Sequence, residues 1–242
     1  MRRWPLFMLM GTALSASALF AKPAKNLSDI ERMRDAAGTR ARFDRLETAV
    51  AQANLIFAST VGVVSQPFAI EAQRLPGGEW SVRERMGVLD QSWTGPGLAF
   101  PAAEPTEASR ARERFFFLLA PDHLARGVPE APYLGLGHFQ GRLCRRLEVK
   151  SPAGEGAWTV FLDTDTHRLR GLRTADGGAW LFEDEQMFQN QFELPTRWSR
   201  FSAAGKRMEV VQITALAFNV FLTNFKDAPA EPPVAPGRGE KR

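Results

Sequence analysis

Residues 161–169, FLDTDTHRL, bring three side chains with metal-binding or acid–base chemistry close together. Asp163, Asp165 and His167 stand two positions apart, so three carboxylate or imidazole groups fall within five residues. Such groups bind zinc and similar cations, and they also serve as general acids and bases. The elements on either side decide whether this spacing marks a site.

Those flanking elements indicate a turn. Residues 158–162 and 168–172 both have the composition of strands, and Asp and Thr stand at the reversal. Asp side chains in turns commonly accept hydrogen bonds from their own backbone. The other histidines, His123 and His138, are isolated, and the sequence contains neither H-E-x-x-H nor C-x-x-C. We therefore predict a β-hairpin turn here and no metal site.

No other group of residues predicts catalysis. The nucleophile motif G-x-S-x-G, the P-loop and a dinucleotide fingerprint are absent. The acidic run 183–185, EDE, falls at the end of a predicted strand, where a solvated loop is expected. Cys144 is interpreted as a buried small hydrophobe, and Gly135 and Gly137 as marks of a bulge or close backbone approach within a strand. We expect neither an enzyme nor a cofactor.

The N-terminus has the composition of a secretory signal peptide. Arg2 and Arg3 precede an apolar run that reaches about residue 20, and small residues offer cleavage near 18 or 21. The run is short for a membrane span, and a retained anchor is the alternative. We predict a signal peptide over 1–21 and a soluble mature protein in the periplasm.

Composition limits what the mature chain can do. Without Arg2 and Arg3, 29 Lys and Arg residues face 27 Asp and Glu residues, a net charge of +2, and the arginines are scattered. A nucleic-acid partner is therefore not expected. Cys144 is the single cysteine, which excludes an intramolecular disulfide. We predict one domain over 22–225, a disordered Pro/Ala/charged tail over 226–242, and a monomer.

Two segments have helical periodicity. Residues 28–53 carry apolar side chains at spacings of three and four, after a capping box of Ser28 and Glu31. Gly38 is expected to kink or split this helix. Residues 107–124 predict a second helix, whose continuation is limited by proline near its end.

The remaining segments predict strands. Period-two alternation begins at about Phe68, and residues 133–221 contain seven strand-like runs joined by short connections. Short connections favour antiparallel hairpins over parallel crossover units. The expected fold is α+β, with one large antiparallel sheet.

Aromatic residues concentrate on the predicted strands. They are Trp80, Trp93, Trp158, Trp180, Trp198, Phe161, Phe182, Phe192 and Phe201. Aromatic strand residues ordinarily pack into a core. A long curled sheet can also leave a concave face too wide to fill, which then becomes an apolar ligand cavity.

Three segments carry a family resemblance. Residues 137–149, GHFQGRLCRRLEV, read as glycine, short turn and strand, and residues 158–174 as a strand ending in Asp, a turn and a return strand. In 192–229 a strand with the P-x-x-W pattern precedes a strand ending in Asn. In these features the chain resembles the LolA/LolB-like superfamily, the periplasmic outer-membrane lipoprotein carrier fold.

This resemblance implies a large curved sheet, an incomplete barrel, with helices covering a concave face that is lined for acyl chains. The chain has no cysteine near the predicted cleavage site to which a lipid could be attached, and in this it resembles the soluble carrier branch of the superfamily. A cavity arginine is also implied, and Arg83 and Arg85 are candidates by their position in an early strand.

Our first hypothesis is an exported, non-catalytic carrier or binder of a lipid or acylated ligand, including a role in lipoprotein sorting. An acyl chain of about 16 carbons would gain on the order of 10 kcal/mol on burial, before ordering costs. The residues expected to line its cavity are Trp80, Met86, Trp158, Val160, Trp180 and Phe182. The alternative is a structural or interaction module of the cell envelope, with a filled core and an envelope protein as its partner.

Overall fold

The structure is a computed structural model. It describes residues 27–95, 107–128, 131–150, 157–220 and 222. The predicted signal peptide and the predicted tail lie outside these residues.

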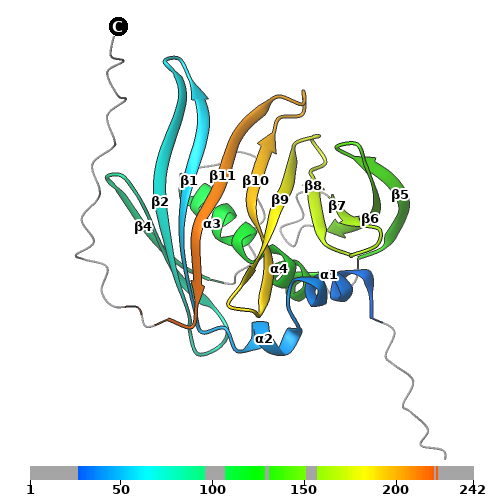
Figure 1. The fold of residues 1–242 in the computed structure, drawn as a ribbon, viewed down its shortest axis with the longest axis horizontal. Coiled ribbons are helices and arrows are strands. Elements are labelled where there is room, and N and C mark those ends of the chain that lie inside the picture. Colours follow the sequence, from blue (N-terminus) through cyan, green and yellow to red (C-terminus); the bar gives the residue numbers. More distant parts are fainter. Residues whose placement is uncertain (1–26, 96–106, 129–130, 151–156, 221, 223–242) are drawn as a thin grey trace, which may run out of the picture.

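The described strands form one antiparallel sheet (Figure 1). They are β1 (Thr48–Ser59), β2 (Gly62–Arg74), β3 (Trp80–Met86), β4 (Leu89–Gly95), β5 (Tyr133–Phe139), β6 (Arg142–Lys150), β7 (Ala157–Asp163), β8 (Leu169–Arg173), β9 (Ala179–Phe188), β10 (Phe192–Phe201) and β11 (Arg207–Phe218). Their order is β4-β3-β2-β1-β11-β10-β9-β8-β7-β6-β5. The sheet curls, and its edge strands β4 and β5 do not pair, so the barrel is incomplete.

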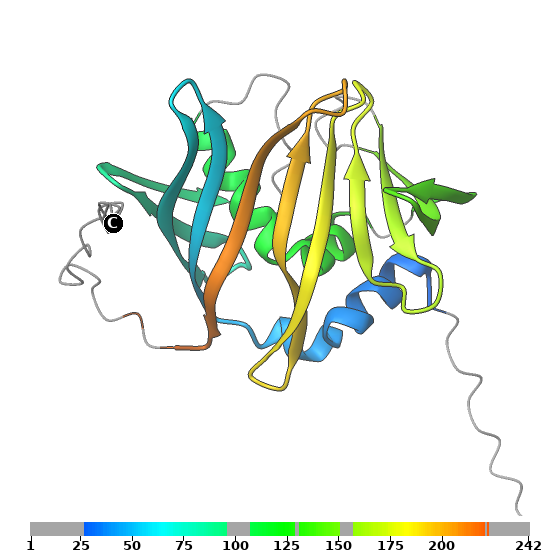
Figure 2. The same cartoon turned by 45° about the horizontal axis from the view of Figure 1, so that its top comes forward.

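Four helices accompany the sheet. They are α1 (Asp29–Ala37), α2 (Arg40–Asp44), α3 (Glu107–Leu118) and α4 (Ala120–Gly127). Helices α3 and α4 lie against the concave face, and α1 and α2 lie at its lower end (Figure 2). The predicted α+β class and the helical cover of the concave face are confirmed.

The predicted helix over 28–53 is wrong beyond its first half. The capping box of Ser28 and Glu31 is confirmed, and α1 ends at Ala37, with Gly38 as its C-cap. A Cβ atom at Gly38 would lie 2.8 Å from the Phe192 ring, so glycine permits close packing there. Residues 48–59 form β1, because their small apolar side chains also alternate with period two and pair on both sides, with β2 and β11.

The second predicted helix is two helices. α3 ends at Leu118, and α4 begins with Pro121 in its first turn, where a missing N–H costs nothing. His123 of α4 lies buried against the rings of Phe115 and Phe116, and its Nδ1 is 3.0 Å from the Phe116 carbonyl oxygen. Burial lowers the pKa of His123 to about 4. The contact between α3 and α4 therefore contains a neutral imidazole at physiological pH.

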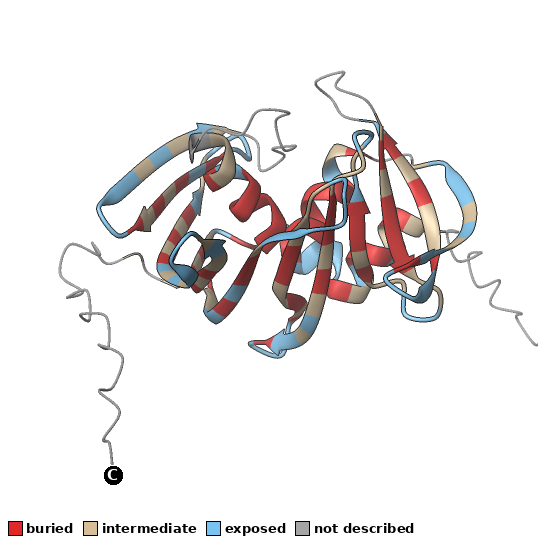
Figure 3. Cartoon of the chain, turned by 90° about the horizontal axis from the view of Figure 1, so that it is seen from above, coloured by how far each residue is buried: buried red, intermediate tan, exposed pale blue. Residues whose placement is uncertain are grey.

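The main core lies between the concave face and α3 and α4 (Figure 3). A smaller cluster lies on the opposite face, where Phe139 stacks on Phe161 at 4.4 Å between ring centroids beside buried Cys144. Cys144 is therefore a buried small hydrophobe, as predicted. Gly171 leaves room for the Phe139 ring, since a Cβ there would meet the ring and lie 2.6 Å from the Trp180 carbonyl oxygen.

We expect Gly171→Ala to lower the free energy of unfolding by about 3 kcal/mol, because the added methyl group must displace Phe139 or the backbone. Urea denaturation measures the loss. Gly95→Ala is the matched control, since its Cβ would meet only Trp93 at 3.9 Å. Equal stability of the two variants would contradict the proposed packing of Phe139.

Candidate functional site

The six residues predicted to line a cavity all lie on the concave face. Trp80 and Met86 come from β3, Trp158 and Val160 from β7, and Trp180 and Phe182 from β9; all six are buried in the main core. The structure thus brings the six predicted residues to one surface. Helix α3 packs directly on that surface.

The phenylalanines of α3 occupy the centre of the concave face. The Phe115 ring lies 5.4 Å from Trp80, and the Phe117 ring lies 5.5 Å from Trp180 and 5.4 Å from Phe182, between centroids. Such edge and tilted contacts are the favoured aromatic geometries. Trp80, Trp180 and Phe182 therefore contact the phenylalanines of α3, and Met86, in the same core, also borders open space.

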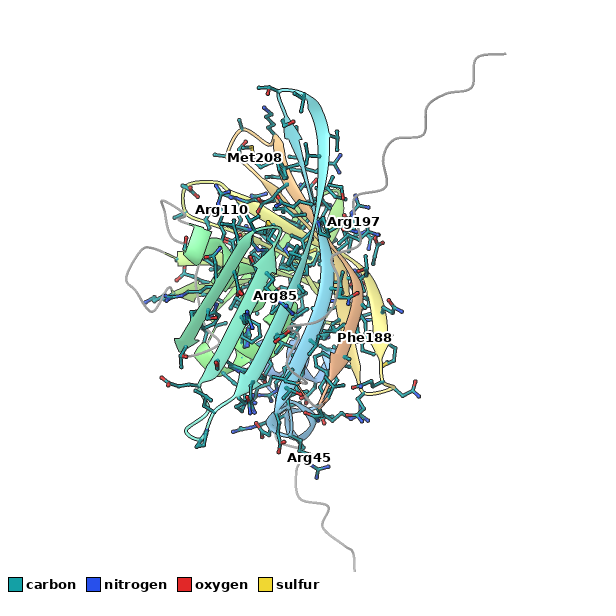
Figure 4. All side chains as sticks on the ribbon, turned by 90° about the vertical axis from the view of Figure 1, so that its left-hand side faces the viewer. Arg45, Arg85, Arg110, Phe188, Arg197 and Met208 are labelled. Carbon is teal, nitrogen blue, oxygen red and sulfur yellow. The ribbon has the colours of Figure 1, made fainter. Side chains whose placement is uncertain are left out.

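That open space, which we name the concave-end cavity, has a volume of about 290 Å³. It lies where the upper ends of β1–β4, β10 and β11 face the first half of α3. Figure 4 shows Met208 and Arg110 toward this end of the molecule and Arg45 toward the other. Its lining residues are Leu55, Phe57, Ala58, Gln66, Met86, Leu89, Arg110, Arg114, Arg200, Met208 and Glu209. The cavity thus combines aliphatic walls with three guanidinium groups.

A buried ion pair fixes α3 at the floor of this cavity. Arg114 donates from Nε to Glu84 Oε2 at 2.8 Å and from Nη2 to Glu84 Oε1, and both side chains are almost completely buried. Burying two charges is expensive unless they pair with good geometry, which this two-bonded arrangement supplies. At the mouth, Arg200 and Glu209 approach more loosely, at 3.9 Å.

Glu113 adds a second polar contact between α3 and the sheet. Its Oε1 accepts a hydrogen bond from Trp180 Nε1 at 2.9 Å. Burial, and then the nearby Glu209 carboxylate, raise the pKa of Glu113 from 4.5 to about 7. This carboxyl group therefore gains and loses its proton near neutral pH, beside the concave-end cavity.

The arginine candidates Arg83 and Arg85 do not reach the cavity. Alternation along β3 places Glu84 and Met86 on the concave face and both arginines on the opposite one. There Arg83 donates to Asp90 and Arg85 to Glu71, each with one bond at 2.8 Å. The cavity arginines come instead from α3 and β10.

The missed residues carry a weak signal in the sequence. Arg110 and Arg114 stand four positions apart, which places them on one face of a helix just before its apolar end. The sequence alone does not show that this helix face packs against β3, because that contact depends on how the helix lies on the folded sheet.

The DTDTH segment is the predicted hairpin turn, between β7 and β8. Asp163 Oδ1 accepts hydrogen bonds from the backbone N–H groups of Asp165 and Thr166 at 3.1 and 3.0 Å. Burial opposes ionisation of Asp163, but these bonds and that from the Thr166 hydroxyl outweigh it and lower its pKa to about 2. Within the described residues, no three or more His, Cys, Asp or Glu side chains are grouped to hold a metal ion.

The acidic run 183–185 and Gly135 both lie within strands. The acidic run 183–185 lies within β9 rather than in a loop at its end, with Glu185 paired to Arg170 and Glu183 near Arg197. Cross-strand arginines stabilise acidic residues there. Gly135 does mark a bulge, with a positive φ of 90° at a register shift in β5.

Comparisons with known proteins concern the fold. No protein-family model matches the sequence, and no curated protein matches it. A domain from Vibrio parahaemolyticus classed with outer membrane lipoprotein-sorting proteins is similar, with 11% identity, a TM-score of 0.54 and coverage of 81% of this chain and 94% of that chain. A DUF1329 family protein from Desulfovibrio piger has 12% identity, a TM-score of 0.54 and coverage of 81% and 93%.

A LolA superfamily protein from Nitrosomonas europaea has 11% identity, a TM-score of 0.48 and coverage of 80% and 93%. The first two likenesses confirm the resemblance to the LolA-like fold. Over the described residues, every helix is too short or too polar to serve as a transmembrane segment.

Replacing Arg114 by Met should lower the free energy of unfolding by about 4 kcal/mol, because Glu84 is left buried and unpaired. The double variant Glu84→Gln/Arg114→Met should recover much of this loss, as measured by urea denaturation. Arg83→Met, which breaks the more exposed Arg83–Asp90 pair between β3 and β4, is the matched control and should change stability little. A loss for Arg114→Met no larger than for the control would refute the proposed clamp.

Glu113→Gln should make stability less sensitive to pH. A raised pKa in the folded state means that the contribution of Glu113 is fully present below about pH 4.5 and is lost as pH rises through 7. As pH rises from about 4.5 to 7, the free energy of unfolding of the variant should therefore increase by on the order of 3 kcal/mol relative to that of wild type. The low pKa of His123 acts in the opposite direction in both proteins and cancels from the difference.

Urea denaturation at several pH values measures this difference. A pH-independent difference between Glu113→Gln and wild type would show that Glu113 keeps its ordinary pKa in the folded protein.

Proposed function

We propose that this protein is an exported, non-catalytic carrier or binder of an amphiphilic, acylated ligand. The observation that supports this best is the concave-end cavity, where aliphatic side chains and guanidinium groups share one wall. Ligand sites combine a mostly apolar lining with a few placed polar groups in this way. An acyl chain would occupy the aliphatic part, and an anionic head group would face Arg110 and Arg200.

The volume sets how much ligand enters directly. At about 290 Å³, the cavity is near the lower limit for ligand sites and holds part of a long acyl chain. A longer chain would displace Phe115 and Phe117 from the concave face, with α3 and α4 moving as a lid that must also give up the Arg114–Glu84 and Glu113–Trp180 contacts. In that state, the chain would contact the predicted residues Trp80, Trp158, Val160, Trp180 and Phe182.

Burial of the chain supplies the binding energy. Each methylene contributes about 0.8 kcal/mol, and a chain that replaces the Phe117 contacts recovers part of what the displaced rings lose. Binding is therefore weaker than burial of the whole chain alone would give. When the gain from burying the chain only slightly exceeds the loss from displacing the rings, the ligand can be released again, as a carrier requires.

The sequence supports the location and the class of ligand. Residues 1–21 have the pattern of a signal peptide, which would deliver the chain to the periplasm. The LolA-like fold adds acylated outer-membrane lipoproteins to the candidate cargo. No set of side chains described above suits a catalytic mechanism.

The alternative is an interaction module of the cell envelope that binds a protein and no small ligand. The packing of Phe115 and Phe117 on the concave face favours it, because this packing fills most of the predicted cavity. The two proposals differ in whether a fatty-acid probe enters.

We expect a dansyl-labelled fatty acid to bind the mature protein with a blue-shifted emission, and Met208→Glu to weaken its affinity about tenfold, since a carboxylate would then stand in the cavity wall. Fluorescence titration measures both. Met187→Glu is the matched control, because Met187 is 52% exposed and Met208 46%, yet only Met208 lines the cavity. Absence of probe binding, or equal affinity in both variants, would favour the interaction module.

A further inference from the structure

Aliphatic side chains are exposed at the hairpin ends beside the concave-end cavity. Val61 and Val63, at the β1–β2 hairpin, are 89% and 78% exposed, and Val88, in the β3–β4 turn, is fully exposed. Leu89 and Met208 are also exposed. Turns are normally occupied by Gly, Asn, Asp, Ser and Pro, so valines at two hairpin ends require an explanation.

These residues share one end of the sheet. Phe57 lies opposite Val64 on β2 and opposite Glu209 on β11, so the β1–β2 and β10–β11 hairpins end together (Figure 1). Met86 lies opposite Phe68, six residues along β2 from Gly62, so the β3–β4 turn points toward the same end but stops short of the other two hairpins. Leu89 after this turn and Ala58 near the β1–β2 turn both line the concave-end cavity. Among the residues that the structure describes, the other exposed large apolar side chains lie on β5, on β6 and at Met187.

The exposed residues continue into the cavity. Leu89 and Met208 are both exposed to solvent and part of the cavity lining. An acyl chain entering beside Leu89 or Met208 would pass from the exposed aliphatic side chains to the cavity wall, next to the Arg200–Glu209 pair at the mouth.

Charge at this end favours an anionic partner. Lys206 and Arg207 are exposed beside Met208. Of the acidic groups nearby among the described residues, Asp90 is held by Arg83 and Glu209 faces Arg200, which leaves Asp176 in the adjacent turn. Basic side chains beside aliphatic ones are the combination that binds anionic lipid surfaces.

We propose that these hairpin ends dock on an anionic membrane surface, with the cavity mouth turned toward the lipid. We name this surface the hairpin rim; it consists of Val61, Val63, Val88, Leu89, Lys206, Arg207 and Met208. Its role in ligand transfer rests on the proposed function, but its binding to membranes does not. A few short side chains and two cations give weak, reversible binding, as a soluble carrier requires.

The test is co-sedimentation of the mature protein with vesicles of phosphatidylethanolamine and phosphatidylglycerol. The double variant Val61→Asp/Val88→Asp should lower the partition coefficient at least about tenfold, since it places charges where aliphatic groups meet the bilayer. Lys206→Gln/Arg207→Gln should weaken binding and reduce its dependence on salt. Met187→Asp, which places a carboxylate at an exposed apolar site at the other end of the sheet, is the control and should bind as wild type does.

The fatty-acid probe separates this proposal from the proposed function. If the double variant Val61→Asp/Val88→Asp loses vesicle binding but keeps its affinity for the probe, the hairpin rim is supported as a membrane-binding surface. Wild type that binds the probe but no vesicles would overturn the rim and leave the carrier function standing. Equal vesicle binding by the double variant and wild type would also overturn it. So would a wild-type dimer that the double variant fails to form, if neither protein binds vesicles.

Discussion

The structure depends on how α3 covers the concave face of the curled sheet. A sheet of this width buries its concave face only if another element fills the curve, and α3 does so with successive phenylalanines. The helix is positioned by polar contacts at the same time: Arg114 pairs with Glu84 of β3, and Glu113 accepts a hydrogen bond from Trp180 of β9. Strands from both halves of the sheet are thereby tied to one helix.

The same arrangement explains why open space remains between the start of α3 and the sheet. Toward α4 the face is closed by aromatic rings, whereas toward the start of α3 the side chains are arginines, whose charge cannot be buried without partners. The concave-end cavity is therefore the region in which helix and sheet cannot pack a dry core. Under the proposed function, a ligand with both an apolar chain and an anionic group would occupy this region.

Much of the fold could be predicted from the sequence, because turn chemistry and period-two alternation mark the hairpins locally. The capping box at Ser28 and the turn at Asp163 were predictable for this reason. Residues 48–53 were misassigned, because Ala-rich alternation also satisfies helical spacing and only pairing with β2 and β11 decides between them. The six concave residues share a face because alternation fixes it, but their burial under Phe115 and Phe117 depends on tertiary packing. The cavity arginines depend on the meeting of α3 and β3, which are distant in the chain.

The proposed carrier function requires the concave-end cavity to bind an acylated ligand. Native mass spectrometry of the mature protein, purified from its own envelope fraction and followed by organic extraction, tests it most directly. We expect the protein to carry an additional mass that extraction identifies as an acyl lipid or lipopeptide. A clean apo mass, together with no uptake when acylated ligands are added back, would contradict the claim.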